Sequence, residues 1–249
     1  MKQLQTRALV LRSRPFGEKD RLLTLFSLEI GKISAKAPGA RLIKSKLSAG
    51  VEPLTSASFL LHKGRSIYTV TQLQIEQSYG GIRANISDYA VGLYMAELIE
   101  KAVEEGEALP FVYNLLSECW SLLNEQKGDR DVLARFFELA LLNILGYSPH
   151  LTDCIFCGTA AAPFFWNSET GGIFCRDCSA GLHASPLTGG TLALLRSFSS
   201  LSTSKIVNLR APEEQKQELQ SILQQYLQYW AGIGALQSMT FLRKINETQ

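Results

Sequence analysis

The hydrophobic positions of the first 80 residues follow the spacing of β-strands. Short apolar runs occupy residues 9–11, 22–26, 59–61 and 67–70, and residues 32–37 alternate polar with apolar side chains, as a half-buried strand does. The segment Lys63-Gly64-Arg65-Ser66 separates the last two runs and predicts a hairpin turn. About five short strands in roughly 75 residues predict a small barrel, and the five-stranded OB-type barrel is the simplest choice.

The hydrophobic period changes to that of helices near residue 81. Apolar side chains recur at three- and four-residue intervals in 91–102, 112–123, 133–145 and 219–230, and Pro110 and Pro212 stand where helices commonly begin. We therefore expect an α+β multidomain protein, with an N-terminal OB-type β-barrel at 1–80 and a helical domain at 81–249. Residues at about 150–182 interrupt the helical pattern and form an inserted module.

The interrupting module carries four cysteines in two pairs. Two residues separate Cys154 from Cys157 and Cys175 from Cys178, and 17 residues lie between the pairs. Two such pairs complete the tetrahedral all-sulfur shell of a structural Zn²⁺ site, and the apolar segments 164–166 and 172–174 predict the hairpin of a zinc ribbon. Because four thiolates leave no open position for water, we expect structural rather than catalytic zinc. An iron–sulfur cluster is the alternative.

Charge is distributed unevenly along the chain, although the formal net charge is only +2. Residues 1–80 carry a net charge of +8, residues 81–150 carry −6 and residues 151–249 carry 0. The basic barrel therefore suits a polyanion such as DNA, whose phosphates Lys and Arg bind without reading its sequence. The candidate DNA-binding residues come from predicted turns and strand ends: Arg12, Arg14, Lys36, Arg41, Lys44, Lys46 and Arg65. The alternative is that these cations form an ordinary solvated surface.

Three aromatic residues accompany the basic clusters. Phe16, Tyr68 and Tyr79 are candidates either for stacking on nucleic-acid bases or for the hydrophobic core. The fifth cysteine, Cys119, lies on the apolar stripe of a predicted helix and is expected to be a buried core thiol.

Known catalytic constellations are missing from the sequence. There is no GxxxxGK[ST] phosphate loop, no GxGxxG after a strand, and no GxSxG elbow or Cys–His pairing for a nucleophile. We therefore expect no catalytic residues and no enzyme activity. A metal-dependent nuclease, a zinc-containing RNA-binding protein and a protein-interaction scaffold stay open as alternatives. No stretch approaches the ~18 apolar residues of a membrane span, and five cysteines, an odd number, fit a reducing cytoplasm.

A series of short segments runs through the chain in a recognisable order: Gly17-Glu18-Lys19-Asp20-Arg21-Leu22-Leu23-Thr24, Gly31-Lys32-Ile33-Ser34, Gly39-Ala40-Arg41, Lys44-Ser45-Lys46, Arg135-Phe136-Phe137-Glu138-Leu139, Leu145-Gly146-Tyr147 and the four-cysteine cluster. Each segment alone is modest, but their order and spacing are specific. Together they resemble the bacterial RecO family of DNA-repair recombination mediators. The resemblance covers nearly the whole chain and is weakest after about residue 185.

The resemblance implies an N-terminal OB fold and a helical domain with a zinc module inserted between helices. It implies binding of single- and double-stranded DNA, annealing of complementary strands, and a complex with RecR that helps load RecA onto DNA coated by single-strand-binding protein. Such a protein would act in the cytoplasm, at the nucleoid. Lys36, Arg41, Lys44 and Lys46 match the family's DNA-binding loop.

A second partner site is implied on a helix of the second half of the chain. Arg135 and Phe136 match the region where some members of the family hold the acidic C-terminal tail of single-strand-binding protein. Arg135 would bind carboxylates of that tail, and Phe136 or Phe137 would line an apolar slot. The alternative is that Arg135 pairs with Asp131 one turn earlier and that both phenylalanines belong to the core.

Overall fold

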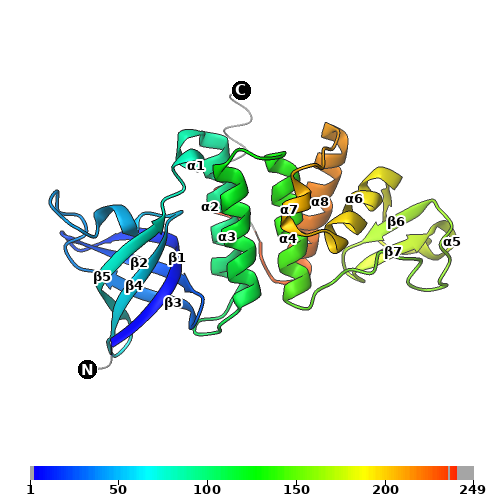
Figure 1. The fold of residues 1–249 in the computed structure, drawn as a ribbon. Coiled ribbons are helices and arrows are strands. Elements are labelled where there is room, and N and C mark those ends of the chain that lie inside the picture. The colour runs from blue at the N-terminus through cyan, green and yellow to red at the C-terminus, as the bar shows by residue number, and fades with distance from the viewer. Residues whose placement is uncertain (1–2, 235, 240–249) are drawn as a thin grey trace. The chain divides into compact units, whose positions relative to one another are not determined.

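The computed structural model describes residues 3–234 and 236–239, and contacts within the chain divide it into two compact units (Figure 1). The first unit comprises the described residues up to Gln126 together with 236–239, and the second begins at Lys127. The expected boundary at residue 80 separates strands from helices, whereas these contacts group the first three helices with the barrel.

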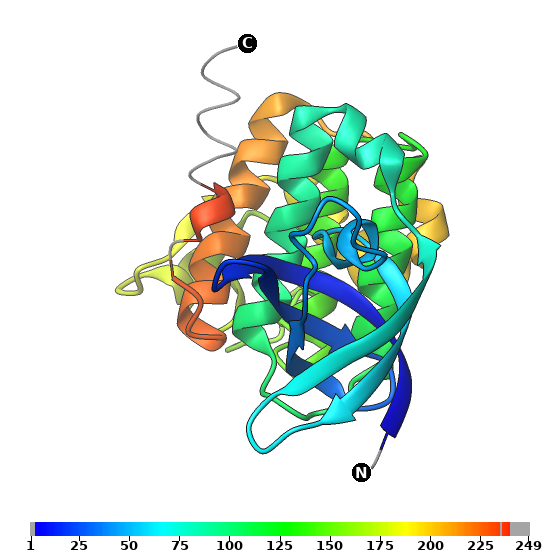
Figure 2. The ribbon, with the colours of Figure 1, turned by 90° about the vertical axis from the view of Figure 1, so that its left-hand side faces the viewer.

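The first unit begins with a closed five-stranded barrel, which confirms the predicted OB-type architecture (Figure 2). Its strands are β1 (Gln3–Phe16), β2 (Asp20–Ser27), β3 (Gly31–Ala37), β4 (Ser56–Lys63) and β5 (Tyr68–Gln77), arranged in the order β1-β2-β3-β5-β4. A short 3-10 helix, η1 (Ser48–Val51), lies between β3 and β4. Strand β1 pairs with β4 through its first half and with β2 through its second half. A register shift between Val10 and Arg12 interrupts the pairing with β2, as a β-bulge does.

The barrel core follows from the alternation along the strands. Inward positions hold small and branched apolar side chains that are buried: Leu23 and Leu25 in β2, Ile33, Ala35 and Ala37 in β3, and Ala57, Phe59 and Leu61 in β4. The residues between them point outward, because successive side chains of a strand alternate between the two faces of a sheet. The outward set on β1, β2 and β3 carries the cations described below.

Three helices complete the first unit: α1 (Gly80–Ala84), α2 (Ile86–Ala102) and α3 (Pro110–Asn124). The side chain of Asn85 caps α2 by accepting hydrogen bonds from the backbone N–H groups of Ser87 and Asp88. The indole N–H of Trp120 in α3 donates to the carbonyl of Gly92 in α2 at 3.1 Å. Cys119 is fully buried in α3, and burial raises the pKa of its thiol, so it is the core cysteine that the sequence predicts.

The second unit is built on α4 (Arg130–Ile144), α6 (Gly189–Ser200), α7 (Thr203–Ile206) and α8 (Glu213–Trp230). Asp129 caps α4 and forms an ion pair of 2.7 Å with Lys216 of α8. Between α4 and α6 the chain forms β6 (Phe164–Asn167), β7 (Gly172–Cys175), α5 (Arg176–Ser179) and β8 (Ser185–Leu187), with sheet order β7-β6-β8. The predicted hairpin between the cysteine pairs is therefore confirmed.

Aromatic side chains attach this small sheet to α8. Trp166 of β6 packs edge-on against Tyr226, and the indole N–H of Trp230 donates to the carbonyl of Ser168 at 2.8 Å. Among the described helices, none has the length and apolar character needed to cross a membrane.

Candidate nucleic-acid interface and metal centre

Cations of the barrel gather on the outward face of β1, β2 and β3 because the strand registers bring them together. Arg14 lies opposite Leu22, which in turn lies opposite Lys36. In the neighbouring outward row, Arg12 lies opposite Thr24, which lies opposite Ser34. Hydroxyl and cationic side chains of this kind are the usual partners of phosphate oxygens. This surface, from Arg12 and Arg14 across to Ser34 and Lys36, is called the basic face below.

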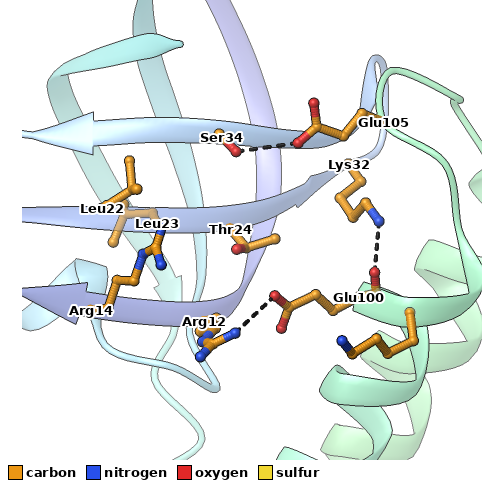
Figure 3. A pocket seen from close by; sticks show the side chains of 10 residues that line it. Arg12, Arg14, Leu22, Leu23, Thr24, Lys32, Ser34, Glu100 and Glu105 are labelled. Atoms are coloured by element: carbon orange, nitrogen blue, oxygen red, sulfur yellow. Dashed lines mark hydrogen bonds and ion pairs between the residues drawn. The ribbon is translucent and has the colours of Figure 1, made fainter. Parts of the chain in front are cut away.

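A hollow of about 250 Å³ opens on the basic face (Figure 3). Its cationic lining consists of Arg12, Arg14, Lys32 and Lys101, and Thr24 and Ser34 contribute hydroxyl groups. The last turn of α2 and the segment after it close one side with Glu100 and Glu105. The hollow therefore combines four cations with two carboxylates.

One of the two carboxylates pairs with a cation of the hollow, and the other accepts a hydrogen bond from a hydroxyl group. Glu100 pairs with Arg12 at 3.3 Å, and the carbonyl of Glu100 accepts a hydrogen bond of 2.6 Å from the Lys32 ammonium. Ser34 donates to the carboxylate of Glu105 at 3.3 Å, and the backbone N–H of Gly106 donates to the Lys32 carbonyl at 2.9 Å. The sequence pattern gave no indication of these acidic partners, which lie 68 to 88 positions away along the chain.

Beyond the basic face, the loop 38–47 supplies three more of the predicted cations. Arg41, Lys44 and Lys46 are exposed. The guanidinium of Arg41 donates to the Gly17 carbonyl at 2.9 Å, which ties the loop to the turn between β1 and β2. Asp20, the first residue of β2, accepts a hydrogen bond of 2.7 Å from the backbone N–H of Gly39.

Asp20 also holds Lys36, at 2.8 Å. The hydrogen bond from Lys36 and then that from the Gly39 N–H lower the pKa of the Asp20 carboxyl below its ordinary value. The carboxylate is therefore ionised at neutral pH. It holds the start of the loop through the Gly39 N–H and neutralises part of the Lys36 charge.

Arg65 is exposed at the tip of the β4–β5 hairpin. Ala35 and Lys36 pair in parallel with Tyr68 and Thr69 at the start of β5, so the tip, which precedes Tyr68, lies toward the start of β3 and away from loop 38–47. The structure therefore brings Lys36 and the loop to one end of the barrel and leaves Arg65 outside this group. Arg14 adjoins this group through the register with Lys36, and Arg12 lies one outward row further away.

Of the three aromatic candidates for stacking, only one is well exposed. Tyr79 is buried and lies edge-on to Trp120, so it belongs to the core. Tyr68 is half-buried and packs against the barrel core. Phe16 is 43% exposed, and the ammonium of Lys36 lies 5.6 Å from the centre of its ring.

The four predicted metal ligands converge in the second unit. The Sγ atoms of Cys154, Cys157, Cys175 and Cys178 all lie within 4.8 Å of one another, and Cys157 and Cys175 are 3.7 Å apart. Tetrahedral Zn²⁺ with bonds of about 2.3 Å would require sulfur atoms about 3.8 Å apart, so the cluster has the dimensions of such a site. These four cysteines could hold a metal ion.

Backbone N–H groups prepare Cys154, the first of the four cysteines, to act as a ligand. Burial opposes ionisation of Cys154, but hydrogen bonds from the N–H groups of Cys157, Cys175 and Phe156 outweigh it and lower the pKa of that thiol to about 6. The Cys154 carbonyl also accepts from the N–H of Gly158 at 2.8 Å, and Gly158 has a φ of +71°. Glycine adopts that conformation at no steric cost, which explains its position after the pair.

Two residues outside the cysteine pairs hold the module in place. The backbone of His150 exchanges hydrogen bonds with Gly171 and Ile173, at 2.8 and 3.1 Å, which aligns the first pair beside β7. Arg196 of α6 donates to the carbonyls of Leu151 and Thr152 at 2.7 and 2.9 Å. Periodicity gives no signal for such a contact, since Arg196 is one polar residue on an amphipathic helix.

Arg135 and Phe136, the predicted partner-binding residues, lie in the interior of the second unit. Arg135 is 7% exposed and forms an ion pair of 2.8 Å with Glu138. Phe136 and Phe137 are both buried, and Phe136 lies edge-on to Phe198 of α6. Contact between these side chains and a partner stays a prediction.

Comparison with known proteins gives consistent matches along the chain. A family model described as "Recombination protein O N terminal" matches residues 1–79, and one described as "Recombination protein O C terminal" matches residues 83–240. DNA repair protein RecO from Alkaliphilus metalliredigens is 32% identical over 97% of this chain and 99% of its own length. The proteins of that name from Pelotomaculum thermopropionicum and Bacillus subtilis are 37% and 31% identical, over 92% and 94% of this chain and 90% and 91% of their own lengths.

Proposed function

The chain belongs to the RecO family of DNA repair and recombination proteins, and from that premise we propose that it binds single- and double-stranded DNA and anneals complementary strands. The observation that carries the proposal is the convergence of Arg14, Lys36 and the loop 38–47 at one end of the barrel. These side chains come from β1, β3 and the loop that follows β3, and together they present a surface on which phosphates can lie.

Annealing by this surface is an electrostatic process. Two DNA strands repel each other through their phosphates, and a cationic surface that binds both lowers that repulsion and raises their local concentration. No covalent bond is made or broken, so the proposed role requires no catalytic residue and we infer that the protein is not an enzyme. The hydroxyl groups of Thr24 and Ser34 add phosphate contacts that carry no sequence preference.

We propose that Cys154, Cys157, Cys175 and Cys178 hold one structural Zn²⁺ ion. The sulfur separations and the hairpin between the pairs support zinc over an iron–sulfur cluster, because this is the layout of a zinc ribbon. The ion would join the two cysteine pairs and stabilise a small sheet that has little core of its own. An all-thiolate shell leaves no position for substrate, so the proposed metal is structural.

We further propose that the protein acts in the cytoplasm at the nucleoid, with RecR, to load RecA onto DNA coated by single-strand-binding protein. Membership of the family supports this assignment. The tail of single-strand-binding protein would be received near Arg135 and Phe136. Because both side chains are buried, direct contact requires local opening around α4.

Charge reversal on the loop tests the proposed function. Arg41→Glu combined with Lys44→Glu is expected to abolish annealing of complementary oligonucleotides at moderate salt while leaving the melting temperature unchanged, since both side chains are exposed. Lys205→Glu combined with Arg210→Glu changes the net charge equally on exposed residues of the second unit and serves as the control. Normal annealing by the loop variant would contradict the assignment, and tighter binding of RNA than of DNA of the same sequence would favour an RNA-binding function.

A further inference from the structure

The loop 38–47 exposes two hydrophobic side chains among its cations. Ile43 is completely exposed to solvent and Leu42 is 50% exposed. Arg41 precedes this pair and Lys44 follows it, and both cations are exposed as well. The apex of the loop is therefore an apolar point with a positive charge on either side.

The loop is held in this conformation by its own hydrogen bonds. The N–H of Leu42 donates to the Gly39 carbonyl at 3.0 Å, and the N–H of Ser45 donates to the Leu42 carbonyl at 2.9 Å. The N–H of Arg41 donates to the Lys19 carbonyl at 2.9 Å, which fixes the loop to the turn between β1 and β2. The apex is thus preorganised rather than free to fold back onto the barrel.

Apolar residues at both ends of the loop do point inward. Ala40 is buried in the barrel core and Leu47 packs against that core. The chain thus buries the apolar side chains at both ends of the loop and exposes the two at its apex. Exposing two adjacent apolar side chains to water is unfavourable. A partner that covers Leu42 and Ile43 would therefore bind more tightly because their apolar surface is removed from water.

The charges around the apex identify the chemistry of that partner. The segment 38–47 contains three cations and no acidic residue. The nearby carboxylate of Asp20 is occupied by Lys36 and the Gly39 N–H. Phe16, also exposed, lies beside Lys36. A partner that matches this surface carries anions and flat apolar faces at short intervals, which describes a single strand of nucleic acid.

We propose that Ile43, supported by Leu42, is a wedge that inserts between unstacked bases while Arg41 and Lys44 bind the phosphates on either side. The loop then favours single-stranded DNA and duplex ends over closed duplex, in which stacked bases leave no face for Ile43. Insertion of apolar side chains at base steps is an established way in which proteins unstack DNA. This inference rests on the proposed function and adds to it the means by which the protein selects unpaired strands.

The test uses the full chain, a single-stranded oligonucleotide carrying 2-aminopurine, and a closed hairpin duplex, which is a dumbbell with a tight loop at both ends of the duplex and therefore no free ends. Ile43→Ser is expected to weaken single-strand binding about fivefold, at the low end of what base stacking contributes. It should also abolish the rise in 2-aminopurine fluorescence that reports unstacking, and leave hairpin affinity unchanged. Ile43→Leu keeps an apolar side chain and should retain both signals. Ile86→Ser, at a 55% exposed position at the start of α2, is the matched control and should behave as the wild type.

Salt dependence separates the wedge from the charges. Ile43→Ser should shift the dissociation constant without changing the slope of log Kd against log salt, whereas Lys44→Gln should reduce that slope by about 0.7. Unchanged single-strand affinity in Ile43→Ser, or an equal loss on the hairpin, would overturn the wedge while wild-type binding still supports the proposed function. Absence of wild-type DNA binding would overturn both. Binding to phosphatidylglycerol vesicles that depends on Ile43, without a 2-aminopurine signal, would overturn the wedge in favour of a lipid surface.

Discussion

Removal of the Glu100 charge is expected to strengthen DNA binding. In the free protein Glu100 pairs with Arg12 at 3.3 Å, at the edge of the hollow on the basic face. A phosphate that binds Arg12 must displace this carboxylate or lie beside it. Glu100→Gln keeps the size of the side chain and removes both the competing ion pair and the repulsion. The hydrogen bond from Lys32 goes to the backbone carbonyl of Glu100 and is preserved.

The size of the effect follows from the exposure of the pair. The side chains of Arg12 and Glu100 are 52% and 22% exposed, so solvent screens their attraction. Ion pairs of this kind contribute about 0.2–1 kcal/mol, which corresponds to about 1.4- to 5-fold in affinity. If Arg12 neutralises one further phosphate, the slope of log affinity against log salt for single-stranded DNA should become steeper by up to about 0.7.

Fluorescence anisotropy with a labelled single-stranded oligonucleotide measures both quantities. Glu118→Gln removes the same charge from an exposed position on α3 that does not line the hollow, and it is the control for net charge. Arg12→Gln combined with Glu100→Gln should show no gain over Arg12→Gln alone, since the effect passes through Arg12. Equal affinities of Glu100→Gln and Glu118→Gln, or a gain that persists without Arg12, would refute the reasoning.

Three further predictions concern stability and metal content. Gly31 has a φ of +72° and a Cβ there would overlap the Glu107 backbone, so Gly31→Ala should lower the free energy of unfolding by more than ~1 kcal/mol in urea denaturation. Gly17→Ala, at φ +65° with open space around it, should cost less; equal losses would contradict the overlap. Cys157→Ser should reduce bound zinc, measured by mass spectrometry, from about one ion per chain to near zero, whereas Cys119→Ala should keep the ion. Retention of zinc by Cys157→Ser would contradict the assignment of the four cysteines as ligands. Burial raises the pKa of Asp129, but hydrogen bonds from Lys216 and the α4 backbone outweigh it, so the pKa is lowered in the folded state. The Asp129 carboxylate therefore stabilises the fold above its unfolded pKa, and this stabilisation is lost as the pH falls. Lys216→Met should consequently lower the free energy of unfolding less below about pH 4 than at neutral pH. A loss that is the same at both pH values would contradict this assignment.

Short-range patterns were sufficient to predict the barrel and the metal ligands. The alternation of Leu23 and Leu25, and of Ile33, Ala35 and Ala37, is a local property of each strand, and it fixes which side chains face the core. Two-residue spacing within each cysteine pair is likewise local, and the hairpin 164–175 then brings the pairs together. These features depend on neighbours in sequence, which periodicity and spacing describe well.

Contacts between distant segments could not be predicted in the same way. Glu100 and Glu105 approach the basic face only because the end of α2 lies beside β3, and nothing in their sequence neighbourhood indicates it. Arg135 was assigned to a partner-binding site through the family resemblance, yet it is buried with Glu138 three residues later. A Glu at that spacing inside an otherwise apolar stripe was the available signal for a buried pair.

The salt dependence of single-stranded DNA binding by the wild-type protein tests the central claim most directly. If the basic face and loop 38–47 bind phosphates, log affinity should fall linearly with log salt, with a slope of about −3 for four phosphate contacts. The same anisotropy titration, repeated over a series of sodium chloride concentrations, gives this slope. A slope near zero, or no binding at low salt, would contradict the account of the barrel as a phosphate-binding surface.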